Sequence, residues 1–464
     1  MSQPHTFGEL TASGYRPRSL REELRSNLTR ALKDNEPLLP GVLGYDDSVL
    51  PQLANALLAG QDVLLLGERG QAKSRIIRGL TRFLDPEIPV LDGLELPESP
   101  FAPVTAQGRA LIAEQGEAAP IKWISRDERY AEKLATPDIT IADLIGEVDP
   151  IKVAEGRYLA DELTLHYGMI PRANLGIFAI NELPDLAERI QVGLLNILEE
   201  RDVQIRGHRV RLPLDILLVA TANPEDYTNR GRIITPLKDR YAALIRTHYP
   251  TTSAAEIDIV AQEAFSPTVD DIDLQVPRFM QEIVVGITQA ARRSGDVSQH
   301  SGVSVRASIA SLEALNANAV RRALRNTEEI AIPRICDLHF VLPSLAGKIE
   351  FEAMEDGEEA RILRGLVNHA VKLEFDQHFQ LADFEQTIGA FAEGFEAEVS
   401  ADAAAADYAD LADRLPELVA AFDLLRADSA AARASVTEFV LEGLHLHKML
   451  NKDSRGAGIS FTGT

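Results

Sequence analysis

The feature that most constrains the fold is a short apolar run followed at once by a glycine-containing loop and a helical pattern. The run is Val63–Leu66, and the loop after it reads Gly67-Glu68-Arg69-Gly70-Gln71-Ala72-Lys73-Ser74. Beyond the loop, apolar residues fall on one face of a helix: Ile76, Ile77, Leu80 and Leu84. An apolar run without alternation is typical of a strand buried on both faces of a parallel sheet. The sequence therefore predicts a strand, a tight loop and a helix in direct succession.

A loop of this kind can hold the phosphates of a nucleotide. Its backbone amides and the start of the helix point at an anion, and Gly67 and Gly70 let the backbone approach closely because they lack a Cβ. We expect Lys73 to reach the β- and γ-phosphates and Ser74 to hold Mg²⁺, which prefers oxygen ligands. Ala72 stands where the usual pattern has its last glycine. Taken alone, the loop has a plain surface turn as its alternative explanation.

A second apolar run, Gly176–Ile180, ends in Asn181 and Glu182, and we expect it to be a strand next to the first one. P-loop enzymes carry an acid pair at such a strand end, where one member supports Mg²⁺ and the other polarises the attacking water. We expect Glu182 to act as a general base or to position the water. The amide of Asn181 can accept a hydrogen bond from Mg²⁺-bound water but adds no negative charge. The alternative is that Glu182 only caps the next helix, where Pro184 suits the first turn.

A third apolar run, Ile216–Ala220, leads into Thr221-Ala222-Asn223-Pro224. Open α/β sheets bind ligands at the carboxyl ends of their strands. Asn223 is therefore expected to orient the water opposite Glu182. The alternative is that Asn223 is a turn-former before proline, a role that suits asparagine.

Several arginines are candidates for stabilising the charge of a phosphoryl-transfer transition state. Arg240 is the best of them, because an arginine in this region can reach across to a neighbouring subunit's γ-phosphate. Arg230 and Arg232 are weaker candidates, and Arg306 opens a helical pattern from which it could contact the same phosphate. For any single arginine, a surface ion pair, for Arg240 with Asp239 or another acid, is the alternative.

Composition narrows the functional classes. The 464 residues suggest about three domains at roughly 150 residues each. The formal charge of −24 argues against a protein that mainly coats nucleic acid or an anionic membrane. The single cysteine, Cys336, excludes an internal disulfide and a four-thiolate zinc site. It lies in an apolar helical pattern and is expected in the core. No run of 18 apolar residues is present, so a cytoplasmic protein is expected.

After Pro250 the strand patterns fade and helical patterns follow one another. Residues 381–430 hold 12 acidic and 2 basic side chains, a net charge of −10. This stretch is expected to be either a solvated helical face or a docking surface for a basic partner. A last helical pattern runs from about Pro416 to Leu450, and the tail 452–464 is expected to be frayed.

The sequence resembles an AAA+ ATPase, because five motifs occur together in a fixed order. They are the loop that ends in Ala-Lys-Ser, then Ile-Asn-Glu-Leu, Thr-Ala-Asn-Pro, Leu-Lys-Asp-Arg-Tyr and Ser-Val-Arg. More narrowly, they resemble the clade of the magnesium chelatase I subunit and the MoxR-type ATPases. The Ala-Lys-Ser ending is itself similar to that clade. The resemblance covers roughly residues 37–345. It implies an α/β P-loop NTPase core with a parallel sheet, followed by an α-helical lid. A helical C-terminal region beyond about residue 350 is predicted from its own helical patterns, which the resemblance does not cover.

The resemblance also divides the chain. It implies an AAA+ nucleotide-binding domain over 37–250 and an α-helical lid over 251–395. Residues 1–36 lie before it, and their own pattern predicts a loose N-terminal tail and a short lead-in helix. An acidic, alanine-rich helical region over 396–464 completes the chain. Two inserts are implied: a helix-2 insert over 149–174, and a β-hairpin over 201–210. Both would face a ring pore, where the hairpin could present a basic patch of Arg206, Arg209 and Arg211.

By the same resemblance the protein would form a hexameric ring with ATP and Mg²⁺ between subunits. Lys73, Ser74, Asn181, Glu182 and Asn223 would act in cis. Arg240 would act in trans from the next subunit, and Arg306 from the lid. The output would be metal insertion into a tetrapyrrole, or MoxR-like maturation of a metal cofactor or complex through a partner with a von Willebrand A domain. Neither a membrane nor a nucleic acid is expected as a partner.

Two further hypotheses come from other classes. One is a nucleotide-gated assembly scaffold that barely hydrolyses ATP, because Asn181 replaces an acid. The other is a σ54-type transcription activator. Such proteins carry a Gly-Ala-Phe-Thr-Gly-Ala loop between the phosphate loop and the acid strand, and residues 85–175 contain no such loop.

Overall fold

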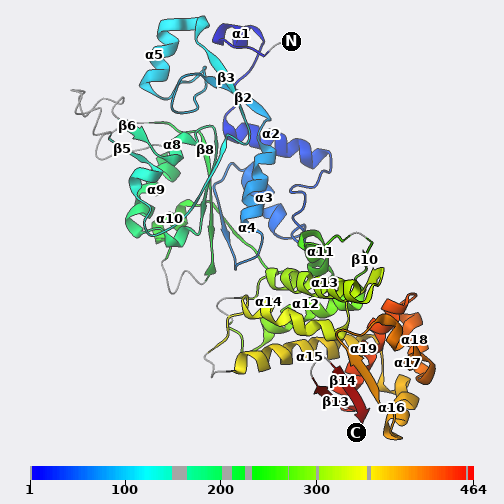
Figure 1. Ribbon diagram of the computed structural model, residues 1–464. Coiled ribbons are helices and arrows are strands. Elements are labelled where there is room, and N and C mark those ends of the chain that lie inside the picture. The colour runs from blue at the N-terminus through cyan, green and yellow to red at the C-terminus, as the bar shows by residue number, and fades with distance from the viewer. Residues whose placement is uncertain are drawn as a thin grey trace. The chain divides into compact units, whose positions relative to one another are not determined.

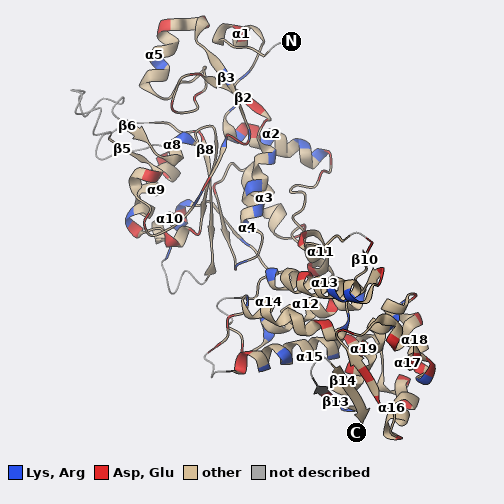
Figure 2. Ribbon diagram, viewed as in Figure 1, with Lys and Arg blue, Asp and Glu red and all other residues tan. Residues whose placement is uncertain are grey.

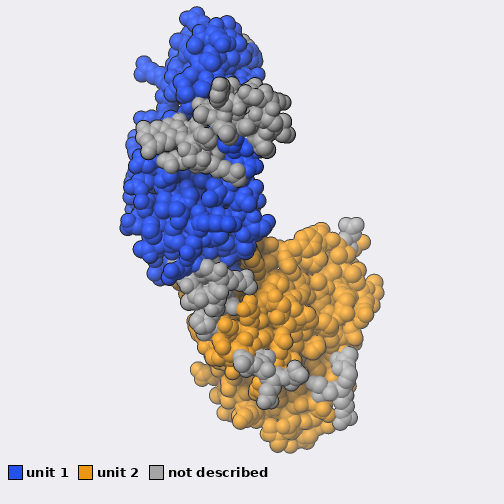
Figure 3. Space-filling model, turned by 90° about the vertical axis from the view of Figure 1, so that its left-hand side faces the viewer, with its two compact units in different colours: residues 1–248 blue, residues 249–464 orange. Residues whose placement is uncertain are grey.

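The computed structural model describes residues 3–148, 165–200, 212–224, 232–269, 271–298, 302–352, 357–455 and 458–464. The chain divides into two compact units, residues 1–248 and residues 249–464 (Figure 3).

A five-stranded parallel sheet forms the centre of the first unit (Figure 1). Its spatial order is β4-β7-β8-β1-β9, with these bounds: β1 Val63–Leu66, β4 Tyr130–Leu134, β7 Gly176–Asn181, β8 Ile216–Ala222 and β9 Ala243–Arg246. The three apolar runs predicted as strands are β1, β7 and β8, so the predicted parallel α/β fold is confirmed. The last residue of β1, Leu66, pairs with Ala222 on one side and Arg246 on the other. The first strand is thus enclosed between two neighbours.

Both faces of this sheet are covered, which explains its uninterrupted apolar strands. Successive side chains of a strand point to opposite faces. Accordingly Val63 and Leu65 pack in one core cluster with helices α2, α3 and α4, while Leu64 and Leu66 pack in another with α9 and α10. These helices are α2 Leu20–Lys33, α3 Val49–Leu58, α4 Lys73–Gly79, α9 Glu188–Glu200 and α10 Thr235–Arg240.

The other elements of the first unit are short. A two-stranded antiparallel ladder joins β2 and β3, and another joins β5 and β6. Helix α1 lies in the segment predicted as a loose tail and is anchored where the Phe7 amide donates to the Ala119 carbonyl at 2.9 Å. Their bounds are α1 Phe7–Ala12, β2 Glu87–Leu91, α5 Ala106–Gln115, β3 Ile121–Ser125, α6 Ile141–Leu144, β5 Gly146–Val148, β6 Leu165–Tyr167 and α8 Met169–Arg172; short 3₁₀ turns span Leu80–Phe83, Gly116–Ala118 and Leu183–Asp185.

The second unit is mainly helical, as predicted for the region after Pro250. Its long helices α12, α13, α15 and α19 share one large apolar core. The helices are α11 Ser253–Glu263, α12 Arg278–Arg293, α13 Arg306–Asn326, α14 Leu342–Ala346, α15 Glu358–His378, α16 Glu385–Ala392, α17 Ala409–Arg414, α18 Glu417–Leu424 and α19 Ala430–Leu446; 3₁₀ turns span η6 Ile335–Val341, η7 Leu381–Phe384 and η8 Ala405–Tyr408, and a short ladder pairs β10 Asp273–Leu274 with β11 Ile330–Ala331.

Two expectations for the C-terminal end differ from the structure. The single helical pattern expected to Leu450 is two helices, α18 and α19, separated near Arg426, whose φ of +54° does not fit a helix. The tail expected to fray instead forms β13 (Leu450–Arg455) and β14 (Gly458–Gly463), which join β12 (Ala397–Ser400) in an antiparallel sheet. Burial of Phe461, which is 1% exposed, ties this sheet to the helical core.

Acidic residues lie in α16, α17 and α18, as Figure 2 shows: Glu385, Asp410, Asp413, Glu417 and Asp423. Several of those in 381–430 already have partners within the unit. The Glu417 carboxylate accepts the amides of Gln386 and Thr387 at 3.1 and 2.8 Å, and Asp402 pairs with Arg325 at 3.0 Å. Part of the acidic stretch therefore caps a neighbouring helix or forms ion pairs within the second unit. Docking of a basic partner on the rest of it stays a prediction.

Among the described residues, no helix is both long and apolar enough to cross a membrane.

Candidate nucleotide-binding site

The phosphate loop leaves the sheet at the carboxyl end of β1, between β8 and β9. The Gly67 amide donates to the Ala222 carbonyl at 3.1 Å, and the Thr247 amide donates to the Leu66 carbonyl at 2.8 Å, so both flanking strands hold the start of the loop. A Cβ on Gly67 would collide with the side-chain oxygens of Thr247 and Gln71. Glycine is therefore required here by close packing within the protein, and the predicted approach of its backbone to a phosphate stays a prediction.

A small network of polar groups supports the loop. The Thr247 hydroxyl donates to the side-chain oxygen of Gln71 at 2.6 Å. The Tyr45 hydroxyl lies 3.0 Å from the Gln71 carbonyl and 2.8 Å from the His248 carbonyl, within donating distance of both. Burial raises the pKa of Tyr45 to about 12, so its phenol stays protonated. Sequence reasoning missed Tyr45 and Thr247, because no motif marks residues that contact the loop from behind.

Ala72 has a left-handed backbone with φ +56° and ψ 14°, directly before α4. A left-handed conformation costs an L-residue roughly 1–2 kcal/mol, whereas glycine adopts it freely. Gly70, two residues earlier, also has a positive φ of +74°. A left-handed backbone at position 72 is consistent with the preference of the usual motif for glycine there, and in this chain alanine adopts it.

Lys73 links the loop to β8. Its ammonium donates to the carbonyls of Gly67 and Glu68, the latter at 2.7 Å, and to the side-chain oxygen of Asn223 at 2.8 Å. Asn223 is only 4% exposed, whereas Lys73 is half-buried. The structure therefore brings together the two residues that the sequence predicted as phosphate-binding and water-orienting groups.

The acid strand is not next to the loop strand. The sheet order places β8 between β7 and β1, so the predicted adjacency of the two strands is wrong. The reason is that the crossover from β7 enters the sheet at β8, and β8 then pairs with β1 on its other side. Asn181 and Glu182 nevertheless lie at the same carboxyl edge as the loop, one strand farther away.

Thr221 connects the acid strand to β8. Its hydroxyl accepts the Glu182 amide at 2.9 Å and lies 3.5 Å from the side-chain oxygen of Asn181. Thr221 and Asn223 are two residues apart in an extended segment and so point to the same side. One side of β8 thus contacts β7 through Thr221 and the phosphate loop through Asn223. A polar residue in an otherwise apolar strand was the available signal for Thr221.

Glu182 also has a left-handed backbone, with φ +57° and ψ 49°. The 3₁₀ turn Leu183–Asp185 follows it directly, and the Asp185 amide donates to the Glu182 carbonyl at 2.9 Å. The Glu182 side chain makes no capping hydrogen bond to this turn. Left-handed residues cost free energy and cluster at functional sites.

The candidate arginines differ in their location and in their partners. Arg240 donates to the Glu199 carboxylate at 2.8 and 2.5 Å and to the Pro236 carbonyl at 2.9 Å, which is the ion pair considered as its alternative, with Glu199 as the acid. Arg232 is exposed and lies 3.8 Å from Glu188. Arg306 is exposed at the first turn of α13, in the second unit. Arg230 lies outside the described residues.

Oxygen ligands for Mg²⁺ are sparse. Ser74 is exposed on the first turn of α4, and Asn181 is half-buried at the end of β7. Within the described residues, no cluster of three or more histidine, cysteine or acidic side chains could hold a metal ion. Mg²⁺ in nucleotide sites is held by few protein ligands together with substrate phosphates and water. The residues present therefore fit Mg²⁺ only as part of a nucleotide complex.

Two predicted elements cannot be compared with the structure. The β-hairpin with Arg206, Arg209 and Arg211, and most of the 149–174 insert, lie outside the described residues. The insert's end includes β6 and α8.

Comparisons with known proteins agree with this fold. The family model described as Sigma-54 interaction domain matches residues 155–241, the segment that contains β7, α9 and β8. An uncharacterised protein of Bacillus subtilis, YeaC, is 24% identical over 259 residues, which are 51% of this chain and 75% of that protein. The magnesium-chelatase subunit ChlI of Guillardia theta is 26% identical over 228 residues, which are 46% of this chain and 58% of that protein.

Among solved structures, the complex of subunits BchI and BchD of magnesium chelatase contains a similar chain. It is 17% identical, with 69% of this chain and 97% of that chain covered and a TM-score of 0.34. The sequence matches support a relationship of this chain to AAA+ ATPases, magnesium chelatase subunits among them. The parallel sheet with its phosphate loop agrees with that relationship.

Proposed function

We propose that the chain binds ATP with Mg²⁺ at residues 67–74 and hydrolyses it as an AAA+ motor of the magnesium chelatase I or MoxR type. The observation that carries this proposal is the hydrogen bond of 2.8 Å between Lys73 and Asn223. It joins the phosphate loop to the strand that also fixes Glu182 through Thr221. A cation, an amide and a carboxylate-bearing strand end therefore share one edge of a parallel sheet, where such folds bind ligands.

Lys73 has the first role in this mechanism. Its ammonium, held by loop carbonyls and by Asn223, is positioned to exchange these partners for phosphate oxygens. A phosphate is a stronger partner for an ammonium than a neutral carbonyl, because the attraction between opposite formal charges adds to the hydrogen bond. Release from Lys73 leaves the Asn223 amide free to hold the attacking water. Ser74 and Asn181 would hold Mg²⁺, which would neutralise phosphate charge there.

Glu182 accepts the proton of the attacking water or orients it. Its amide is fixed by Thr221, so the start of the side chain is held at the strand end. Asn181 brings no charge to Mg²⁺, and we expect slow hydrolysis for that reason. Arg240, released from Glu199, is proposed to act in trans on the neighbour's nucleotide, and Arg306 to contact it from the helical lid over 251–395.

This activity is proposed to operate in a ring, most simply a hexamer in the cytoplasm. The motor would remodel a partner protein with a von Willebrand A domain, or drive metal insertion or cofactor maturation. The relative named as a magnesium-chelatase subunit supports this class of output.

Two variants test the nucleotide site. Lys73→Ala is expected to lower ATP affinity by at least tenfold, measured by fluorescent-nucleotide titration. Glu182→Gln is expected to keep that affinity and to lower steady-state phosphate release by at least tenfold. Unchanged affinity in Lys73→Ala would refute the site, and unchanged turnover in Glu182→Gln would refute the assignment of the base. Arg75→Gln, on the exposed side of α4, is the matched charge control.

Asn181 specifically favours a second candidate, a nucleotide-gated scaffold that assembles on ATP but barely hydrolyses it. Asn181→Asp separates the two. A wild-type rate near zero that becomes measurable only in Asn181→Asp supports the scaffold, whereas a slow but measurable wild-type rate that Asn181→Asp raises further supports the motor. The match to the Sigma-54 interaction domain also leaves a transcription activator as a third hypothesis. Residues 85–175 carry no Gly-Ala-Phe-Thr-Gly-Ala loop, which counts against it.

A further inference from the structure

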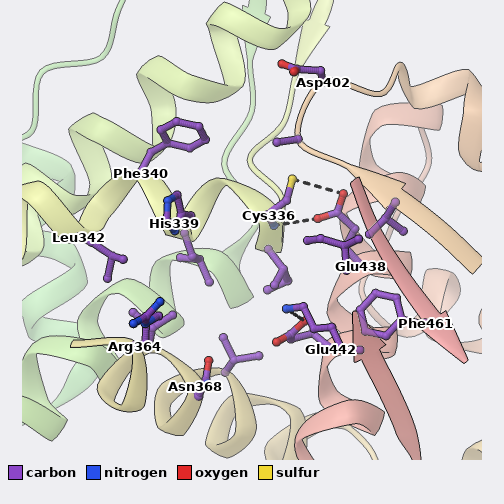
Figure 4. Close-up of a pocket in the computed structure, with 18 of the residues that line it drawn as sticks. Cys336, His339, Phe340, Leu342, Arg364, Asn368, Asp402, Glu438, Glu442 and Phe461 are labelled. Atoms are coloured by element: carbon purple, nitrogen blue, oxygen red, sulfur yellow. Dashed lines mark hydrogen bonds and ion pairs between the residues drawn. The ribbon is translucent and has the colours of Figure 1, made fainter. Parts of the chain in front are cut away.

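The second unit contains a cavity of about 580 Å³, bordered by α13, η6, α15, α19 and the C-terminal sheet. That volume is in the range of small-molecule binding sites. Figure 4 shows side chains of Arg364 and Asn368 from α15, and of Glu438 and Glu442 from α19, around it. No motif of the sequence marks this place, and the nucleotide site of the first unit does not use it.

Most of the cavity wall is apolar. Its aliphatic and aromatic side chains include Ile335, Leu338, Leu342, Val367, Val371 and Phe461. The buried carboxyl of Glu438 also borders the cavity, and its hydrogen bonds are taken up within the fold. It accepts the Cys336 amide at 2.8 Å and the Tyr408 hydroxyl at 2.5 Å, and burial raises its pKa.

The charges of the lining do not balance. Lys452 pairs with Glu442 at 2.6 Å, and Arg325 pairs with Asp402 at 3.0 Å, so these four cancel. Two further arginines, Arg321 and Arg364, border the same cavity.

Neither of these two has a carboxylate partner among the described residues. Arg321 donates to the Asn318 amide oxygen at 2.5 Å and stacks over Phe340, 4.8 Å from the ring centroid. Arg364 donates to the Ala360 carbonyl of its own helix at 3.1 Å. Both guanidinium groups are exposed enough to meet a ligand. The lining therefore combines an apolar wall with two arginines that have no carboxylate partner among the described residues.

We propose that this cavity binds a small organic anion, whose carboxylate or phosphate pairs with Arg321 and Arg364 and whose apolar body packs on the aliphatic wall. Guanidinium groups suit both acids, since their planar donors match two oxygens at once. A neutral ligand would leave the two cations without a partner. A cation would be repelled by them.

The only cysteine of the chain provides a local readout. Cys336 borders the cavity and is 8% exposed, and no other thiol is present to react. A ligand in the cavity is expected to slow labelling of Cys336 by N-ethylmaleimide. Burial raises the pKa of this thiol, so labelling is expected to be slow and is best followed at alkaline pH. Thermal unfolding of the full-length protein gives a second readout that does not depend on thiol reactivity.

The experiment compares decanoate, decyl phosphate and decanol on the full chain. Decanoate or decyl phosphate is expected to protect Cys336 and raise Tm, with decanol at least tenfold weaker, and the stronger anion identifies the preferred acid. Arg321→Gln and Arg364→Gln are each expected to weaken anion binding about tenfold, the loss of one charge-assisted contact of roughly 1.4 kcal/mol. Arg361→Gln, on the same helix but paired with Glu358, is the control and should change nothing.

Asn368→Trp is expected to fill the cavity mouth and abolish protection, and the exposed position of Asn368 should spare the fold. The proposal is overturned if both anions fail in both readouts up to their solubility limit. It is equally overturned if decanol binds as well as the anions, or if the two arginine variants bind like Arg361→Gln. Nucleotide is absent from every arm, so the result does not depend on the proposed ATPase activity.

Discussion

The hydroxyl of Thr221 is the contact through which the acid strand is tied to β8, and its removal tests the proposed geometry directly. Thr221→Val keeps the side-chain shape but leaves the Glu182 amide without its acceptor at 2.9 Å. Thr221 is 3% exposed, so water cannot easily replace the lost partner. An unsatisfied buried donor costs about 1–3 kcal/mol. Taking about 2 kcal/mol and a urea m-value of about 2 kcal/mol per molar, the midpoint should fall by about 1 M.

The assay can isolate the first unit. Trp123 is the only tryptophan of the chain and lies in β3, so its fluorescence during urea unfolding reports on that unit. Thr437→Val is a matched control in the second unit. Its hydroxyl donates to the Arg433 carbonyl one turn earlier in the same helix, at 2.8 Å, and that carbonyl keeps its helical surroundings. We expect the Trp123 transition to be unchanged in Thr437→Val.

The same variant separates fixing of Glu182 from nucleotide binding. Thr221→Val leaves Lys73 and Asn223 intact, so ATP affinity is expected to stay within twofold while phosphate release falls about tenfold. Thr221→Ser restores the hydroxyl and should recover most of the rate. If Thr221→Val unfolds at the wild-type urea concentration and hydrolyses ATP at the wild-type rate, the argument that Thr221 holds the acid strand end is refuted.

Three further perturbations follow from the loop and its support. Ala72→Gly removes the cost of a left-handed alanine but raises the conformational entropy of the unfolded chain, which costs about 0.5–1 kcal/mol of stability. The urea midpoint followed by Trp123 fluorescence should therefore rise slightly or stay unchanged. A clear fall would contradict the left-handed backbone at Ala72. Gly67→Ala forces a Cβ against Thr247 and Gln71 and should abolish binding of a fluorescent ATP analogue, whereas near-normal affinity would show that the loop tolerates the clash. The fold raises the pKa of Tyr45 from 10.0 to about 12, so the stability that this shift contributes is complete below pH 10.0 and is lost as pH rises towards about 12. Tyr45→Phe should flatten the plot of stability against pH in that range. Identical slopes for the variant and the wild type would exclude Tyr45 as the cause.

Three of the five strands of the core sheet, β1, β7 and β8, could be predicted because they obey a simple rule. Val63–Leu66 is apolar throughout, and Gly176–Asn181 and Ile216–Ala222 are apolar except for Asn181 and Thr221. Near-continuous apolar runs of this kind are typical of strands buried on both faces. Their spatial order could not be predicted, because order depends on which crossover enters which edge, and this is not encoded in any local pattern. The insertion of β8 between the loop strand and the acid strand is a finding of that kind.

The C-terminal sheet was missed for a related reason. Leu450–Arg455 is polar apart from its first residue, and Gly458–Gly463 contains small residues and only two large apolar ones, Ile459 and Phe461. Such segments have weak strand patterns on their own. They become strands because each satisfies the other's backbone groups, with Ala397–Ser400 as a third partner far away in the sequence.

The candidate site shows the same division between residues with a chemical signature and residues without one. Glu182 and Asn223 directly follow the ends of strands, and Lys73 ends the loop after β1. These positions in the sequence are enough to predict a functional role. Thr221 and Tyr45 hold them through single hydroxyls and look like ordinary interior residues in the sequence. If the proposed ATPase is slow, the direct chemical reason is that Asn181 lacks the negative charge of an aspartate. Whether Glu182 can compensate for that charge depends on the hydroxyl of Thr221, which holds the end of the acid strand. We therefore expect Asn181→Asp to raise the rate of ATP hydrolysis and the double variant with Thr221→Val to lose that gain. This result would mean that the carboxylate at position 181 acts only when Thr221 keeps the end of β7 in place.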